Sequence, residues 1–370
     1  MTDWMKKLSG EFAQAANKLP KPSDHVIALP SPSLNWAVGN GGITQGKAIV
    51  LFGPESGGKS LIKQLIYIQM QKDFPEGIVI DFDTEFSFNP EWFEKLGGDL
   101  SRLIVKQTND PYEIFDYIAG DLNEMIQDGC PIVGLGIDSI KAIRYPKEMN
   151  KKKSTDMTMG GSGASYLGGA FKMILPVIRK HNITTILVQQ VYMEMDPYKA
   201  MTRPYIVPDG FALKHFADYM FQVDRWETKE GRIEDGKNMA GGFNQVGHKL
   251  NVKLMKNRVS APYRVAQLSL RYDTGIVNQE REIYALAESL GVLGKMANPN
   301  TGKLSMIGFT RADGTDILCK TKAEMEQWIA DNPEYWDEII DLCYKVTDSA
   351  IATRNQKIVT VEAMITEEDL

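Results

Sequence analysis

The sequence predicts an α/β protein with a mostly parallel central sheet flanked by helices. Four continuous apolar runs are typical of strands buried on both faces of such a sheet, and they lie at residues 48–52, 77–82, 131–137 and 184–188. Segments of helical character, such as residues 111–126 and 167–179, alternate with these runs. Each run ends in polar or glycine residues, and ligands of open α/β sheets bind at that edge.

The first apolar run leads into a glycine-rich loop that is followed by a helical pattern. The loop reads GPESGGKS over residues 53–60 and fits G-x-x-x-x-G-K-[ST], a motif that binds phosphate groups between a strand and a helix. Backbone amides, the positive end of the helix dipole and Lys59 would hold the phosphate oxygens, and the Ser60 hydroxyl would bind Mg²⁺. A glycine turn can also be purely structural, but the complete motif in this context favours nucleotide binding. The candidate contacts are Gly53, Pro54, Glu55, Ser56, Gly57, Gly58, Lys59, Ser60 and Leu61.

Polar residues at the ends of the other apolar runs are the remaining catalytic candidates. Asp138 is the expected carboxylate for Mg²⁺, directly or through a bound water. Glu85 is the candidate to polarise the attacking water, and Gln190 is a neutral donor and acceptor suited to contact the γ-phosphate. Each residue also has a structural alternative, because Asp138 could cap a helix and the other two could be surface residues.

Length and composition narrow the class of protein. A chain of 370 residues is expected to hold more than one folded unit. No apolar stretch approaches the roughly 20 residues of a membrane span, and no signal peptide is recognisable, so we expect a cytoplasmic protein without a membrane partner. The three cysteines and four histidines are scattered and match no metal spacing. The net charge of −6 argues weakly against a surface that binds nucleic acid throughout, yet it permits a local basic path.

Two long segments between the apolar runs are candidate DNA-binding loops, at about residues 145–165 and 192–212. The first has four lysines and a Met-Gly-Gly-Ser-Gly run, and the second shows no periodicity, which is typical of functional or disordered loops. The second begins just after Gln190, so nucleotide state could be coupled to DNA binding there. The alternative is a solvated lysine run and a mobile lid. Lysine, arginine, aromatic and methionine side chains suit a nucleic-acid backbone and its bases; the candidates are Lys151, Lys152, Lys153, Met157, Met159, Gly160, Ser162, Tyr198, Lys199, Arg203, Tyr205 and Phe211.

The sheet, the phosphate loop and the two candidate DNA-binding loops form a core that we place at residues 31–280. The rest of the chain lies before and after this core. Residues 1–30 contain an amphipathic helix and a Pro-containing linker, and the apolar face of the helix would dock on another subunit or on its own domain. Residues 250–276 alternate as β-strands that extend the sheet. Residues 281–347 are expected to form a small α/β or mostly helical domain, and residues 348–370 a mobile acidic tail.

Together these segments resemble the bacterial RecA family of ATP-dependent strand-exchange proteins, and the departures suggest a phage-type member. The loop at residues 53–60 is similar to the family's GPESSGK[ST], with Gly57 in place of a serine. DTE at residues 83–85, NPEW at 89–92 and KLG at 95–97 resemble the family's D-A-E-x-x-x-D-P-x-Y and KLG segments. Further matches are IDS at 137–139, QQ at 189–190, KNR at 256–258 and AP at 261–262.

The resemblance implies roles for residues that composition and spacing leave open. It makes Glu85 the catalytic carboxylate and Gln190 the γ-phosphate sensor. Trp92 takes the position of the aromatic that stacks on adenine, with Asn89 beside it, and Tyr272 is a further nucleotide contact. The cations Lys256 and Arg258 match a pair that reaches the ATP of the neighbouring protomer; without the resemblance they are a charged strand edge.

The function that follows is an ATP-dependent DNA recombinase that forms filaments on single-stranded DNA. It would catalyse homologous pairing and strand exchange in recombination and repair, with ATP and Mg²⁺ as cofactors and hydrolysis at the protomer interface. The expected partners are single- and double-stranded DNA, further copies of the chain in a helical polymer, and possible single-strand-binding and mediator proteins. Two alternatives are a hexameric DNA helicase or motor with the same core and an ATP-dependent scaffold filament.

Overall fold

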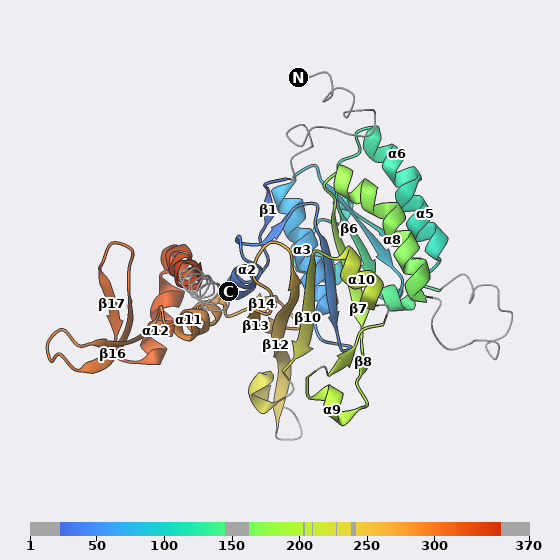
Figure 1. Cartoon of the computed structure of the whole chain (residues 1–370). Helices are drawn as coiled ribbons and strands as arrows, with labels where there is room; N and C mark the ends of the chain where they lie inside the picture. Colours follow the sequence, from blue (N-terminus) through green and yellow to red (C-terminus); the bar gives the residue numbers. More distant parts are fainter. Residues whose placement is uncertain are drawn as a thin grey trace, which may run out of the picture.

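The computed structural model describes residues 23–144, 163–202, 204–208, 210–226, 228–237 and 242–348 of the chain. The α/β class is confirmed, because a ten-stranded sheet forms the centre of the molecule and helices cover it (Figure 1). The strand order is β14-β13-β12-β10-β3-β7-β6-β4-β5, and β11 pairs with β12. No helix among the described residues is both long enough and apolar enough to span a membrane.

The parallel part of the sheet contains the four apolar runs predicted as strands. They are β3 (Ala48–Gly53), β4 (Ile78–Asp83), β6 (Ile132–Asp138) and β7 (Thr184–Gln190), and nearly all of their residues are buried. Two further parallel strands were not predicted, and they are β5 (Leu103–Lys106) and β10 (Tyr219–Arg225). Because β10 lies beside β3, the phosphate loop begins in the middle of the sheet rather than at its margin.

Antiparallel strands extend the sheet beyond β10, as predicted for residues 250–276. The long strand β12 (Phe243–Asn257) pairs with β10 on one side and with β13 (Val265–Arg271) on the other. The sheet ends at β14 (Gly275–Val277), and β11 (Arg232–Lys237) pairs with the first half of β12.

Alternate side chains of β3 pack into two separate cores, one on each face of the sheet. Ile49 and Leu51 pack in the core that includes α3 (Lys59–Asp73). Val50 and Phe52 pack in the core on the opposite face, which is covered by α5 (Pro111–Ala119), α8 (Gly163–Lys180) and α10 (Gly210–Phe216). The segment predicted as one helix at residues 111–126 is divided at Gly120, where α6 (Asp121–Gln127) begins.

Short elements precede the phosphate loop and follow β4. The strands β1 (Val26–Ile27) and β2 (Ile43–Thr44) pair with each other, and Ser31 caps the helix α2 (Pro32–Val38) between them. The helix α4 (Pro90–Lys95) follows β4 and is capped by Asn89.

The described residues of the second candidate loop, 192–202, 204–208 and 210–212, contain regular elements that the sequence did not predict. The strands β8 (Tyr192–Met193) and β9 (Tyr205–Ile206) pair as an antiparallel hairpin, with the short helix α9 (Pro197–Ala200) between them. Asp196 caps α9, and the backbone amide of Glu194 donates to the carbonyl of Pro204. The prediction failed because strands of two residues are too short to show an alternating pattern.

The C-terminal part contains helices and a small three-stranded sheet that projects from the core (Figure 1). Its elements are α11 (Gln279–Ser289), β15 (Gly294–Ala297), β16 (Leu304–Thr310), β17 (Asp316–Cys319) and α12 (Lys322–Asp331), followed by helical residues up to 348. The expected domain boundary near residue 280 falls at the start of α11.

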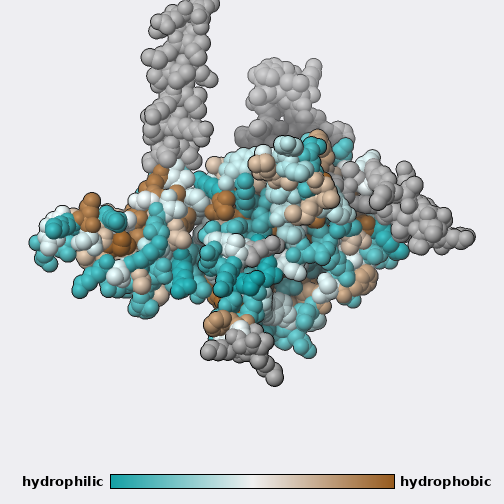
Figure 2. Space-filling view, turned by 90° about the horizontal axis from the view of Figure 1, so that it is seen from below, coloured by the Kyte–Doolittle hydropathy of each residue, from teal (hydrophilic) through white to brown (hydrophobic). Residues whose placement is uncertain are grey.

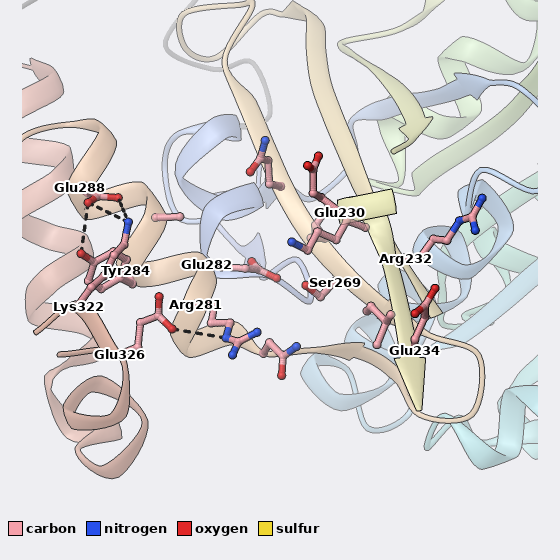
Figure 3. A pocket seen from close by; sticks show the side chains of 16 residues that line it. Glu230, Arg232, Glu234, Ser269, Arg281, Glu282, Tyr284, Glu288, Lys322 and Glu326 are labelled. Atoms are coloured by element: carbon pink, nitrogen blue, oxygen red, sulfur yellow. Dashed lines mark hydrogen bonds and ion pairs between the residues drawn. The ribbon is translucent and has the colours of Figure 1, made fainter. Parts of the chain in front are cut away.

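A cavity of about 450 Å³ lies between α11 and the strands β11 and β13 (Figure 3). Figure 3 shows the charged side chains around it, and two pairs of them interact, Glu288 with Lys322 and Arg281 with Glu326. Glu282 also lines this cavity, although its side chain is 95% buried. This cavity is separate from the phosphate loop, since no residue of the loop lines it.

The remaining predicted segments lie outside the described residues. These are the N-terminal helix, most of the first candidate DNA loop and the acidic tail. Eight candidate DNA contacts also fall there, namely Lys151, Lys152, Lys153, Met157, Met159, Gly160, Ser162 and Arg203.

Candidate active site

The phosphate loop connects β3 to α3 at the carboxyl edge of the sheet. Gly58 precedes the helix in the left-handed region, with φ of 89°, which favours glycine. At Gly53 the loop passes so close to β10 that a Cβ atom would lie 2.1 Å from the carbonyl oxygen of Val223. Both glycines are therefore required by the path of the loop, which leaves the N-terminus of α3 facing a cavity.

This cavity, of about 400 Å³, brings together residues from four separate segments. The strand ends meet because β3 and β7 are paired at Gly53 and Gln190, and β4 and β6 are paired at Asp83 and Asp138. The lining is formed by Glu55, Ser56, Lys59, Ser60, Glu85, Asp138, Val188 and Gln190. Every strand-end candidate for catalysis thus faces the phosphate loop.

Lys59 lines the cavity, and its ammonium donates a 2.5 Å hydrogen bond to the carbonyl oxygen of Pro54. Burial lowers the pKa of Lys59, while the carboxylates of Asp138, Glu85 and Glu55 oppose that shift. A buried cation at the N-terminus of a helix is well suited to bind phosphate oxygens.

Glu85 accepts two hydrogen bonds on one carboxylate oxygen, Oε1. Ser139 Oγ donates to it at 2.5 Å, and Gln190 Nε2 donates at 2.8 Å. Lys141 Nζ in turn donates to Gln190 Oε1 at 3.0 Å. The contacts of Ser139 and Lys141 were not predicted, although Ser139 is the next residue after Asp138 and Lys141 comes three positions after it.

Asp138 also belongs to a buried group of charged residues that sequence analysis missed. Lys63 Nζ lies 2.6 Å from Asp81 Oδ2 and 3.1 Å from Asp138 Oδ2, and the Tyr67 hydroxyl donates to Asp81 at 2.9 Å. Burial lowers the pKa of Lys63, but the two carboxylates outweigh it and the net shift is upward. Burial raises the pKa of Asp81, and Lys63 opposes that shift. The available signal was a charged residue, Asp81, in the middle of an apolar strand.

Comparison with known proteins decides the family. A family model described as the RecA N-terminal domain matches residues 9–277. The chain belongs to the RecA family. It is 26% identical to Protein RecA of Thermus aquaticus over 339 residues, which is 90% of each chain. It is 27% identical to Protein RecA of Acholeplasma laidlawii over 90% of this chain and 92% of that protein. It is 28% identical to Protein RecA of Rhodopirellula baltica over 85% of this chain and 75% of that protein.

This match extends over most of the chain and of its relatives, and it establishes the function of a RecA recombinase. The RecA family consists of DNA-dependent ATPases. The comparisons therefore favour the recombinase over the two alternatives, a hexameric motor and a scaffold filament. The expectation of a phage-type member is not supported, because the relatives named above are bacterial proteins.

The residues that the RecA resemblance assigns to the adenine lie outside the phosphate cavity. The Asn89 side chain caps α4 by accepting a 3.0 Å hydrogen bond from the Trp92 amide. Trp92 is half-buried. Tyr272 lies just after β13, and its hydroxyl contacts the side chains of Gln245 and His248 at 3.0 and 3.2 Å. None of these three candidates lines the cavity at the phosphate loop.

Lys256 and Arg258 lie at the opposite edge of the sheet from the phosphate loop of their own RecA protomer. Lys256 Nζ donates to the backbone carbonyls of Lys214 and Ala217, close to the end of α10. Burial lowers the pKa of Lys256, and the charge of Arg258 acts in the same direction. Arg258 Nη1 lies 3.2 Å from Asp218, just before the start of β10.

The position of Asp218 shows how far these cations are from the loop. Its carboxylate accepts a hydrogen bond from the Ala48 amide at 2.8 Å, at the start of β3. The phosphate loop begins at the other end of that strand, which for six residues is roughly 17 Å away. Lys256 and Arg258 therefore do not line the phosphate cavity of their own protomer.

The β8–β9 hairpin exposes two of the candidate DNA contacts that the residue types of the second loop predicted. Tyr198 is 86% exposed, Lys199 is also exposed, and Phe211 just beyond the hairpin is 81% exposed. Met195 and Met201 are equally exposed and were not among the predicted contacts. Seen from below, this end of the molecule has apolar residues dispersed among hydrophilic ones (Figure 2).

Proposed function

We propose that this RecA-family protein hydrolyses ATP in a site shared between two protomers. One protomer supplies the phosphate loop, Glu85 and Gln190, and the next supplies Lys256 and Arg258. The observation that carries the proposal is the placement of the two cations at the sheet edge opposite the loop. They have no access to the ATP of their own protomer, but in a head-to-tail polymer that edge can face the loop of a neighbour.

Within the cavity, the phosphate loop and Lys59 would bind the phosphates, and Glu85 would orient the attacking water. Ser139 and Gln190 occupy one oxygen of Glu85, which leaves the other oxygen to accept a hydrogen bond from that water. Gln190 contacts Glu85 and lies in the cavity lining, and these two contacts support a further contact of its amide with the terminal phosphate.

The cavity also has a donor set that suits Mg²⁺. The Ser60 hydroxyl and the Asp138 carboxylate both line it, and hard cations prefer such oxygen ligands. Among the described residues, no group of three or more His, Cys, Asp or Glu side chains is arranged to hold a metal. We infer an ion held by the nucleotide and Ser60, with Asp138 acting through water because Lys63 pairs with it. Such an ion would neutralise phosphate charge.

The proposed DNA contacts belong to the two candidate loops, which follow β6 and β7 in the sequence. Tyr198 and Phe211 offer exposed rings for stacking on bases, and Lys199 offers a charge for the backbone. The first loop would add its lysine run. Filament formation through head-to-tail contacts, cytoplasmic location and contact with single-strand-binding or mediator proteins complete the proposed function.

The decisive test measures ATP hydrolysis with and without single-stranded DNA at low and high salt. We expect strong stimulation by DNA, weakened by salt because backbone contacts release counterions. Electron microscopy of the same samples should show filaments that depend on DNA and ATP. Hydrolysis that is indifferent to DNA, in samples without any assemblies, would refute the proposed site between protomers.

A further inference from the structure

Lys141 has a defined position beside the proposed ATP site, but the chemistry above gives it no role. It lies in a short 3-10 turn, Ile140–Ala142, that follows β6. Ile140 and Ile143 are buried on this turn, which packs against β7. The backbone that carries Lys141 is therefore anchored in the core of the sheet.

The ammonium of Lys141 contacts two side chains that are two positions apart in the chain. Its Nζ donates to Gln190 Oε1 at 3.0 Å and lies 4.6 Å from the centre of the Tyr192 ring. A cation over an aromatic ring is attracted to it. Tyr192 is the first residue of β8, so Lys141 contacts both the cavity lining and the start of the hairpin.

Lys141 also selects the orientation of the Gln190 amide. An ammonium group can only donate, so it binds the amide oxygen and leaves the NH₂ group on the other side. That group faces Glu85, where it donates at 2.8 Å. In the reverse orientation the NH₂ group would point at the ammonium. The charge of Lys141 also reaches the phosphate loop, where it contributes to the lowered pKa of Lys59.

We propose that Lys141 is a positioning residue that couples the nucleotide site to the β8–β9 hairpin. One ammonium orients the amide of Gln190 and holds the ring of Tyr192. A movement of Gln190 toward a phosphate therefore changes the anchor of the hairpin. The inference rests on the proposed function, in which Gln190 contacts the terminal phosphate and the hairpin contacts DNA.

The first test is the Lys141→Met variant, which keeps the apolar stem and removes the charge. We expect its KM for ATP in the absence of DNA to stay within about twofold of the wild type, because no phosphate contact is lost. Stimulation of kcat by single-stranded DNA should fall about tenfold, the loss expected for one hydrogen bond to a charged group. Lys141→Arg keeps the charge and the ring contact, so it should restore most of the stimulation. Normal stimulation in Lys141→Met would overturn the proposal.

A double-mutant cycle tests whether Lys141 acts through Tyr192. Tyr192→Leu removes the ring and should lower the stimulation by DNA, and adding it to Lys141→Met should cause little further loss. Fully additive losses would show independent actions and contradict the coupling. The matched control is Lys106→Met. Lys106 is the last residue of the edge strand β5, and its ammonium lies 4.5 Å from the centre of the Tyr117 ring, so it makes the same kind of ring contact without a contact to Gln190. This control should retain normal stimulation.

Gln190→Ala separates failure of this inference from failure of the proposed function. If Gln190→Ala keeps full DNA stimulation, the proposed role of Gln190 is wrong. If Gln190→Ala loses stimulation while Lys141→Met keeps it, only the role of Lys141 is refuted. Should Lys141→Met fail to fold, Tyr192→Leu alone decides, since Tyr192 is 52% exposed and its truncation leaves the core intact. Unchanged stimulation in Tyr192→Leu would then overturn the proposal.

Discussion

The side-chain amide of Gln190 donates a 2.8 Å hydrogen bond to Glu85, and so joins the ends of two strands that are more than 100 positions apart in the chain. Ser139 donates to the same carboxylate oxygen. Because both donors share one oxygen, the other oxygen of Glu85 can accept a hydrogen bond from water. This arrangement gives Glu85 a fixed position and a free acceptor, as the proposed catalytic carboxylate needs.

Glu85→Gln should bind ATP and single-stranded DNA normally and lose hydrolysis by at least about 100-fold, because an amide is a poor acceptor for the proton of the attacking water. Steady-state hydrolysis and binding of a fluorescent nucleotide would separate the two effects. Glu91→Gln, an exposed carboxylate at the start of α4, is the matched control and should remain active. A fully active Glu85→Gln protein would exclude the catalytic role.

The free energy of unfolding of Lys63→Met should be about 3–5 kcal/mol lower than that of the wild type. The substitution leaves the buried carboxylates of Asp81 and Asp138 without their cation. Chemical denaturation monitored by circular dichroism measures this loss. Adding Asp81→Asn to Lys63→Met should recover part of it. Lys72→Met, at an exposed position of the same helix, should change stability little, and an equally small effect of Lys63→Met would mean that the buried pairs contribute nothing.

Glu282 should make the protein less stable as the pH rises. Burial raises the pKa of Glu282 from 4.5 to about 7, and one of its carboxyl oxygens has no partner while the other accepts from Ser31 and Ser33. Between these two pH values the folded state holds a proton that the unfolded state has lost. The free energy of unfolding should therefore fall between pH 4.5 and 7, by about 3 kcal/mol in total.

Glu282→Gln tests this dependence, because an amide does not titrate. Unfolding free energies at pH 5 and pH 8 should differ by about 3 kcal/mol less in the variant than in the wild type. Glu334→Gln removes an exposed carboxylate from the same C-terminal part and should behave as the wild type does. Identical pH dependence in Glu282→Gln and the wild type would rule out Glu282 as its source.

The residues that line the cavity at the phosphate loop could be predicted because most of them follow apolar strands. Parallel strands end at the same edge, so a polar residue after each one, such as Glu85, Asp138 or Gln190, must lie close to the phosphate loop. The buried interactions of Lys63 could not be predicted in the same way, since they depend on which helix face meets which strand. Asp81 in an apolar run was the local sign that a buried cation had to be near.

The hairpin after Gln190 and the short strand β5 show the limit set by element length. Strands of two to four residues give no reliable alternation, and their pairing depends on distant contacts such as the hydrogen bond from Gln189 to the carbonyl of Pro208. For Lys256 and Arg258, the sequence resemblance alone predicted a contact with the ATP of a neighbouring protomer. Only the three-dimensional fold shows that they lie across the sheet from the phosphate loop.

Lys256→Ala should lose DNA-stimulated hydrolysis while the isolated protomer still binds nucleotide, because the cation would act on a neighbour's ATP. Lys59→Ala should lose nucleotide binding or hydrolysis in its own site. Each variant alone is therefore expected to be inactive on DNA. Hydrolysis of each purified variant on saturating single-stranded DNA, with nucleotide binding measured separately, checks both expectations.

Mixing the two variants distinguishes a shared site from two local defects. If contacts run head to tail, each site combines Lys59 of one protomer with Lys256 of the next. In a random equimolar filament, about one quarter of the sites should then have both lysines intact, Lys59 from a Lys256→Ala protomer and Lys256 from a Lys59→Ala protomer. Hydrolysis should then recover toward that fraction of the wild-type rate. No recovery in filaments that electron microscopy shows to be mixed would mean that Lys256 acts within its own protomer. In that case its contacts with the carbonyls of Lys214 and Ala217 would make its role structural.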